Sequence, residues 1–89
     1  MNKDYILAKA VKDVPILKIN KGDLLIFKTN YTLKDKGVYF FKTKTDNYFV
    51  RIYHTETKRF FVSDDLIPPK LEDVEVLGEF QSKYIENDL

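Results

Sequence analysis

At 89 residues, with 44% hydrophobic and 15% aromatic side chains, the chain is long enough for one small packed domain and too apolar to be disordered throughout. It contains no cysteine, which excludes disulfides and thiolate metal sites, so its six tyrosines and seven phenylalanines must supply much of the core. No signal-peptide segment or long apolar span is present, and a cytoplasmic location without a membrane partner is expected.

The net charge of +1 hides a division of charge along the chain. Residues 1–62 hold 13 Lys and Arg against 6 Asp and Glu, whereas residues 63–89 hold 2 against 8. Two arrangements are consistent with this division. Either the acidic segment of residues 64–86 covers the basic body within one molecule, or the basic body faces an anionic partner.

The first third of the chain predicts two strands. Residues 5–10 form a short apolar run without a helix cap, and residues 24–27 form a continuous apolar run behind a turn. Between them Pro15 disfavours regular structure. Residues 11–21 are therefore expected to form a loop that returns its isoleucines and leucine to the core.

A hairpin is predicted in the middle of the chain. Residues 37–43 and 48–54 flank a turn at residues 44–46, and Gly37 suits a positive φ in the turn before them. The strand period of two places Tyr48, Val50, Ile52 and His54 on a face expected to be core, and Phe49, Arg51 and Tyr53 on the other.

Two further strands are expected at residues 59–62 and 73–80, joined by an extended loop over residues 63–70. The whole pattern predicts a mostly β fold: a small, partly closed antiparallel roll or barrel of about six short strands. We expect one domain over residues 1–81, followed by a polar tail of residues 82–89 that forms at most one helical turn.

Residues that could carry catalysis or hold a metal are few. The single histidine, His54, has no second histidine or cysteine at ligand spacing, so it is expected to form a hydrogen bond at a strand end. The three glycines lie too far apart to form a phosphate-binding loop. Neither a cofactor nor a metal ion is expected.

A series of short motifs runs through most of the chain: Gly22-Asp23 before an apolar strand, Gly37 to Phe41, Tyr48 to Arg51, Phe61 to Asp65, Pro68-Pro69, and Val74 to Gly78. In this order and spacing, over about residues 5–81, they resemble the C-terminal domain of LexA-like self-cleaving repressors and UmuD-type mutagenesis proteins. The resemblance implies the LexA and signal-peptidase type of β fold.

In that family a serine nucleophile is activated by a lysine general base. The resemblance puts the nucleophile position on Asp13 or Val14 and the general-base position on Arg51. Neither Asp13 nor Val14 can attack a peptide carbonyl in the family's manner, and arginine stays protonated. With a first strand near Tyr5, we also expect neither a preceding helix-turn-helix segment nor a cleavable linker. We therefore expect no catalytic residues and no enzymatic activity.

The resemblance further implies a fold that pairs with copies of itself through the C-terminal strand and holds an extended peptide in a cleft. The leading hypothesis is a non-catalytic regulatory or protein-interaction module that forms a dimer or binds a protein partner. The family's habits and the small size suggest a phage or other mobile element. The candidate cleft residues are Asp13, Phe49, Arg51 and Tyr53, and the candidate dimer-strand residues are Val74, Val76 and Phe80. Arg51 is expected to be partly buried and paired with Asp13 or a backbone carbonyl.

Two other hypotheses remain open at this point. A small β-barrel could bind single-stranded nucleic acid through the aromatic and basic side chains of the hairpin region, namely Phe41, Lys42, Lys44, Phe49, Arg51, Tyr53, Lys58, Arg59 and Phe60. A hydrolase that uses Asp13 as its nucleophile or base is the third. Whether Arg51 and Asp13 lie within a salt bridge of each other in the folded chain separates several of these hypotheses.

Overall fold

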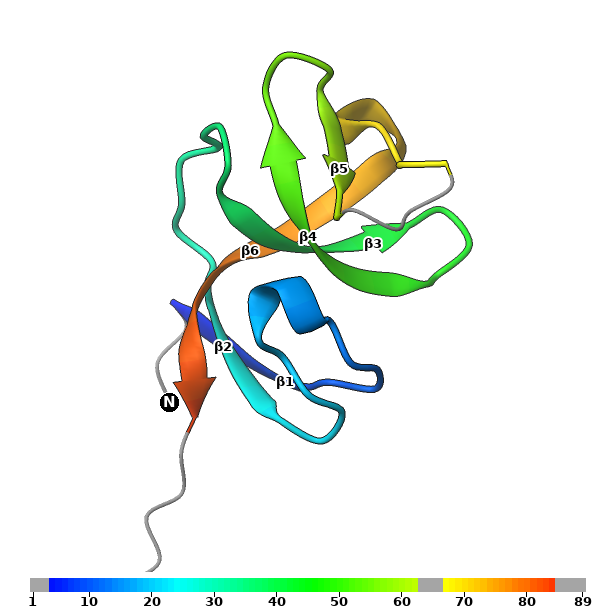
Figure 1. The fold of residues 1–89 in the computed structure, drawn as a ribbon. Helices are drawn as coiled ribbons and strands as arrows, with labels where there is room; N and C mark the ends of the chain where they lie inside the picture. The colour runs from blue at the N-terminus through cyan, green and yellow to red at the C-terminus, as the bar shows by residue number, and fades with distance from the viewer. Residues whose placement is uncertain (1–3, 63–66, 85–89) are drawn as a thin grey trace, which may run out of the picture.

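Six antiparallel strands form one sheet in the order β1-β2-β6-β3-β4-β5 (Figure 1). The computed structural model describes residues 4–62 and 67–84. Its elements are β1 (Tyr5–Lys9), η1 (Pro15–Leu17), β2 (Leu24–Lys28), β3 (Val38–Thr43), β4 (Tyr48–His54), β5 (Arg59–Phe61), η2 (Leu71–Asp73) and β6 (Val74–Tyr84). All six strands expected from the sequence are present.

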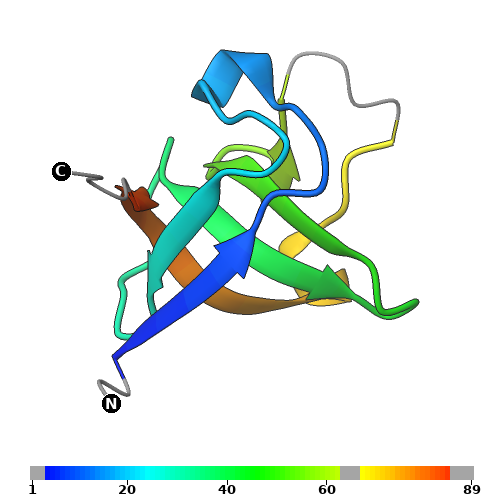
Figure 2. The ribbon, with the colours of Figure 1, turned by 90° about the horizontal axis from the view of Figure 1, so that it is seen from below.

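The sheet is curled but open. Among the described residues β1 pairs only with β2, and β5 pairs only with β4, so the two end strands do not join. The expected mostly β antiparallel fold is confirmed in this form, but the strands do not close into a barrel. Figure 2 shows β1 lying along one side of the sheet, with the loop that follows it at one end.

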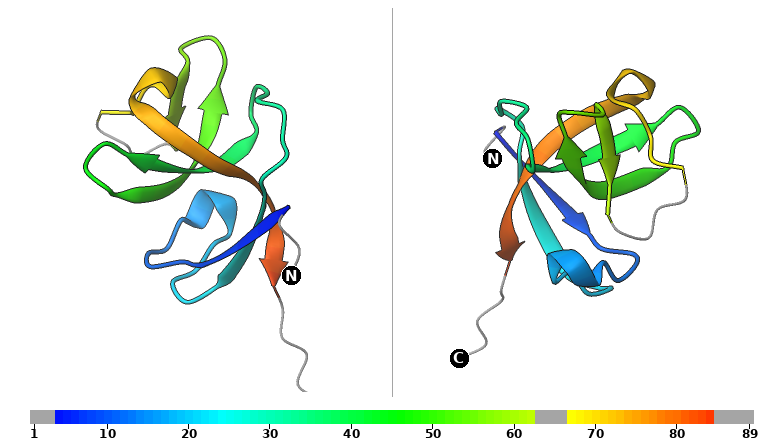
Figure 3. Two further views of the ribbon diagram at one scale, coloured as in Figure 1. Left: turned by 180° about the vertical axis from the view of Figure 1, so that it is seen from behind. Right: turned by 45° about the horizontal axis from the view of Figure 1, so that its top comes forward.

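The longest strand, β6, connects the two halves of the sheet. Its residues 74–79 pair with β3 and its residues 79–84 pair with β2, and Figure 3 shows it curving from one half to the other. The strand continues four residues beyond the expected end at Phe80, so residues 81–84 are strand and not a tail or helical turn.

Gly78 lies at the crossing point of β6. A Cβ atom there would lie 3.0 Å from the Lys28 carbonyl oxygen and 3.0 Å from the Phe27 Cβ, closer than a side chain is normally accommodated. Register shifts occur on both sides, between Ile26 and Phe27 in β2 and between Phe40 and Phe41 in β3. The absence of a side chain therefore allows three strands to meet closely at this bend.

The core consists of two clusters. The hairpin cluster contains Tyr39, Phe41, Tyr53 and Phe60, and the β2 cluster contains Ile19, Leu25 and Phe27. Because successive side chains of a strand face opposite ways, β3 contributes Tyr39 and Phe41 to the first cluster and Phe40 to the second. Both faces of β3 are thus covered, which explains its unbroken aromatic run.

The expected core face of β4 is wrong as a description of the whole strand. Tyr53, assigned to the outer face, is 4% exposed, whereas Tyr48, assigned to the core face, is 55% exposed. Phe49 packs against the hairpin cluster and Val50 against the β2 cluster. The side chains alternate as expected, but alternation cannot identify the core face of a strand that has packing on both faces.

The turn before the hairpin also differs from the expectation. The positive φ, 68°, falls on Lys36 and not on Gly37. Gly37 is required for a different reason, since a Cβ atom there would lie 2.6 Å from the Tyr39 hydroxyl.

The loop after β1 returns apolar side chains to the core, as expected. Ile19 is 1% exposed and Leu17 packs against the β2 cluster, although Ile16 remains 56% exposed. Val14 and Ile19 form an isolated antiparallel bridge that closes the loop on itself.

Ion pairs join the basic body to the acidic segment. Lys34 Nζ lies 3.0 Å from Glu79, Lys42 Nζ lies 3.8 Å from Glu75, and Lys44 Nζ lies 3.7 Å from Asp73. In the part of the acidic segment that the structure describes, charge is therefore compensated at least in part within one molecule.

Candidate functional site

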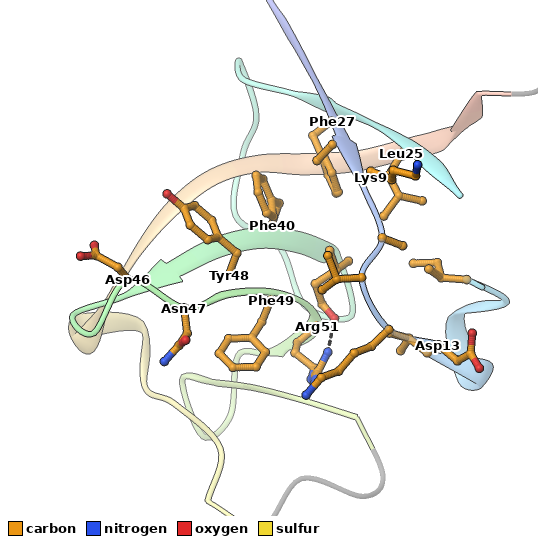
Figure 4. Close-up of a pocket in the computed structure, with 17 residues that line it drawn as sticks. Lys9, Asp13, Leu25, Phe27, Phe40, Asp46, Asn47, Tyr48, Phe49 and Arg51 are labelled. Atoms are coloured by element: carbon orange, nitrogen blue, oxygen red, sulfur yellow. Dashed lines mark hydrogen bonds between the residues drawn. The ribbon is translucent and has the colours of Figure 1, made fainter. Parts of the chain in front are cut away.

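A pocket of about 600 Å³ separates the β1 side of the molecule from the first half of β4 (Figure 4). Residues 8–14 line one side and residues 46–51 line the other. The remaining lining residues are Ile19, Leu25, Phe27 and Phe40, which belong to the β2 cluster or pack against it. The pocket thus has an apolar interior between two segments that are distant in the sequence.

Asp13 and Arg51 lie on opposite sides of this pocket. Asp13 Oδ1 accepts a hydrogen bond of 2.7 Å from the Lys21 N–H, and Figure 4 shows the Asp13 carboxylate directed away from Arg51. Arg51 Nη1 donates a hydrogen bond of 2.8 Å to the Val50 carbonyl oxygen, and the guanidinium carbon lies 5.2 Å from the centre of the Phe49 ring. The expectation that Arg51 is partly buried and bonded to a backbone carbonyl is confirmed.

The structure brings together three of the four candidate cleft residues. Asp13, Phe49 and Arg51 line the pocket, as does Val14, whereas Tyr53 is buried in the hairpin cluster. Sequence reasoning missed Phe27, Phe40 and Tyr48 as pocket residues. The shared face of Tyr48 and Val50 was visible in the sequence, but nothing there indicated that β1 lies across from it.

Three stacked rings form a wall of the pocket. Phe27 and Phe40 have ring centres 4.7 Å apart with an angle of 18° between the planes, and Phe40 and Tyr48 follow at 5.7 Å and 25°. The stack leads from the buried Phe27 to Tyr48, which is 55% exposed. Each ring of this wall therefore contacts the next one.

The pocket side of β4 has an unpaired edge. β5 pairs only with residues 52–54, so within the described chain no strand lies beside residues 48–51 on that side. Tyr53 donates its N–H to the Gly37 carbonyl, so the alternation of an antiparallel ladder directs the main-chain groups of Tyr48 and Val50 away from β3. One of these groups, the Val50 carbonyl, is the acceptor of the Arg51 hydrogen bond.

The edge of β1 is likewise unpaired in the described chain, and its last residue, Lys9, lines the pocket. The outer edge of β5 is different. Phe60 donates its N–H to the Pro69 carbonyl and Leu71 donates to the Lys58 carbonyl, so this edge is covered. Open strand edges therefore occur on both sides of the pocket but not at β5.

The three candidate dimer-strand residues contribute to the core. Val74 and Val76 pack against the hairpin cluster, and Phe80 packs against the β2 cluster. Each half of β6 pairs with a neighbouring strand on one side only, residues 74–79 with β3 and residues 79–84 with β2. In the C-terminal half, alternation directs the main-chain groups of Lys83 away from β2, toward a side that no described strand occupies.

The aromatic surface required for the nucleic-acid hypothesis is largely buried. Phe41 and Phe60 are 0% exposed, and Tyr53 is 4% exposed. Lys42 and Lys44 lie beside the carboxylates of β6 and its preceding turn. Stacking of bases on these rings would require the hairpin cluster to open.

The histidine has the expected hydrogen-bonded environment. His54 Nε2 lies 3.4 Å from the Phe61 carbonyl oxygen, and its ring stacks on Phe61 with centres 3.8 Å apart. Within residues 4–62 and 67–84, no three His, Asp or Glu side chains are grouped to hold a metal ion. In the same residues no helix is long and apolar enough to span a membrane.

Comparisons of the chain with protein-family models, with curated proteins and with solved structures found no match. Residues 63–65 of the motif series lie outside the described residues, as does residue 66 of the expected loop before Pro68.

Proposed function

We propose that this chain is a non-catalytic, LexA-like regulatory module that pairs with a second copy and holds an extended segment of a protein partner between β1 and β4. The observation that carries the proposal is the position of Asp13 and Arg51. The resemblance puts the nucleophile position on Asp13 or Val14 and the general-base position on Arg51, and the first two residues line the side of one apolar pocket opposite Arg51.

The chemistry at these positions supports binding and not hydrolysis. The Asp13 carboxylate is held by the Lys21 N–H, and the Arg51 guanidinium bonds to the Val50 carbonyl. Arginine stays protonated and cannot accept a proton from a nucleophile. The proposed cleft would thus resemble the family's cleft but lack the serine nucleophile and the lysine general base.

The unpaired edge of β4 supports an extended ligand. Main-chain groups of Tyr48 and the Val50 N–H can bond to an added strand, whose side chains would alternate between the pocket and the opposite face. Burial of Phe41, Tyr53 and Phe60 argues against the nucleic-acid alternative, because bases need exposed rings on which to stack.

The binding proposal is tested with isotope-labelled protein, which is titrated with capped, β-branched-rich peptides and separately with oligodeoxythymidine. We expect the peptides to shift the amide resonances of residues 8–13 and 48–51, and oligodeoxythymidine to leave them unchanged. Peptides that leave these resonances unchanged, together with salt-sensitive binding of the oligonucleotide, would replace the proposal with the nucleic-acid alternative.

The dimer is tested by sedimentation equilibrium of the wild-type protein, of Lys83→Ala and of Lys83→Pro. Both variants lose the contacts that the lysine side chain makes with Asp23 and the Lys18 carbonyl, but only the proline also removes an N–H that points away from β2, so Lys83→Pro should weaken strand pairing between copies more than Lys83→Ala. Equal association of Lys83→Ala and Lys83→Pro would exclude this part of β6 as the dimer edge.

A further inference from the structure

We infer that the pocket selects an extended peptide in which an apolar side chain alternates with acidic side chains. This inference rests on the proposed function, because it specifies the ligand of the same site. It is based on three features. The interior of the pocket is apolar, its rim carries positively charged side chains, and the two faces of β4 beside its unpaired edge carry different side chains.

The interior of the pocket accepts apolar groups. Phe27 and Leu25 are 0% and 2% exposed, and Phe40 and Val50 pack against the same cluster. The described residues include no buried polar or charged side chain. A polar ligand side chain in this interior would lose its hydration without gaining a partner.

The ionisable side chains that line the pocket are Lys9, Lys12, Arg51, Asp13 and Asp46. Both carboxylates already have partners. Asp13 accepts the Lys21 N–H at 2.7 Å, and Asp46 lies 3.8 Å from Lys42 Nζ. In the described part of the chain, neither Lys9 nor Lys12 forms an ion pair. The resulting field favours a ligand that brings carboxylates.

The two faces of β4 determine where those carboxylates would lie. Tyr48 and Val50 share one face, whereas Phe49 and Arg51 share the other. A strand added beside β4 follows the same alternation. Its residue beside Val50 therefore enters the apolar interior, and the adjacent residue lies on the opposite face. A carboxylate there stays outside the apolar interior and within the field of the rim lysines, Lys9 and Lys12.

The test uses three capped peptides: alternating valine and glutamate with a central phenylalanine, the same peptide with glutamine for glutamate, and the same peptide with lysine. Affinities are measured for the wild-type protein, for Lys12→Glu and for Lys70→Glu. Lys70 is an exposed lysine that does not line the pocket, so Lys70→Glu makes the same change in net charge elsewhere.

We expect the glutamate peptide to bind the wild-type protein roughly tenfold more tightly than the glutamine peptide, and the lysine peptide to bind most weakly. Lys12→Glu should reduce the preference for glutamate over glutamine to about twofold or less, whereas Lys70→Glu should retain most of it. Retained dispersion of the amide resonances shows that each variant is folded.

Equal affinity for the glutamate and glutamine peptides would overturn the charge selection while leaving the proposed function intact. The same would follow if Lys12→Glu and Lys70→Glu lowered the preference equally. If none of the three peptides shifts the amide resonances of residues 48–51, the proposed function itself fails. Displacement of the glutamate peptide by oligodeoxythymidine would assign the site to nucleic acid.

Discussion

Tyr39 joins the central hairpin to the segment that precedes it. Its hydroxyl accepts a hydrogen bond of 2.8 Å from the Lys34 N–H and donates one of 3.0 Å to the Thr32 carbonyl. The residue is 0% exposed, and burial raises the pKa of its phenol above the ordinary value. One side chain therefore satisfies two main-chain groups while it fills the hairpin cluster.

Tyr39→Phe should lower the free energy of unfolding by about 1–3 kcal/mol, because it leaves the Lys34 N–H and the Thr32 carbonyl without their partner. The matched control is Tyr48→Phe, which removes the same atom from a residue that is 55% exposed. Urea unfolding should give the control nearly the stability of the wild type. Equal losses in both variants would show that the Tyr39 hydroxyl has no special role.

Single residues show where sequence reasoning succeeds and where it stops. The resemblance predicts that Asp13 and Arg51 share one cleft, and both residues line the same pocket, although the Asp13 carboxylate is directed away from Arg51. Tyr53 could not be placed in the same way. Alternation fixes which side chains share a face, but burial depends on what covers that face, and the hairpin cluster is assembled from segments far apart in the chain.

At the level of elements, the six strands were predictable because each is an apolar or aromatic run bounded by turn residues. The length of β6 was not. Its residues 81–84 include three polar side chains, yet they belong to the strand, because residues 82–84 pair with residues 24–26 of β2. The hydrogen bonds that keep this end of β6 in a strand come from β2. The local sequence of a segment does not show which strand it will pair with.

The bend of β6 gives a prediction for Gly78. Gly78→Val should lower the free energy of unfolding by about 1–3 kcal/mol, because the new side chain would meet the Lys28 carbonyl and Phe27 at the crossing of the strands. Gly78 is not among the residues with positive φ, so the cost comes from crowding. Ser82→Val, at an exposed position of the same strand, should have little effect. Thermal unfolding of the two variants measures the difference, and a tolerated Gly78→Val would mean that the strands can separate at the bend.

For the whole molecule, the open sheet raises the question of whether its two halves fold independently. The hairpin cluster and the β2 cluster share no residue, but both depend on β3 and β6. β3 buries consecutive side chains in different clusters, and β6 pairs with β3 and then with β2. Loss of one cluster would therefore expose one face of the strands that support the other, which favours a single cooperative unit.

Phe60→Leu tests this cooperativity from one end of the sheet. Phe60 is 0% exposed in the hairpin cluster, and the smaller side chain should cost about 1–2 kcal/mol. If the molecule is one unit, native-state hydrogen exchange should show the same loss of protection for the slowest amides of β2 as for those of β3 and β4. Leu7→Ala, at a position that is 63% exposed, should change neither set. A loss of protection confined to the amides of β3, β4 and β5 would instead show that the β1–β2 half stays folded alone. The pocket between the two halves would then depend on two separate unfolding equilibria, one for each half.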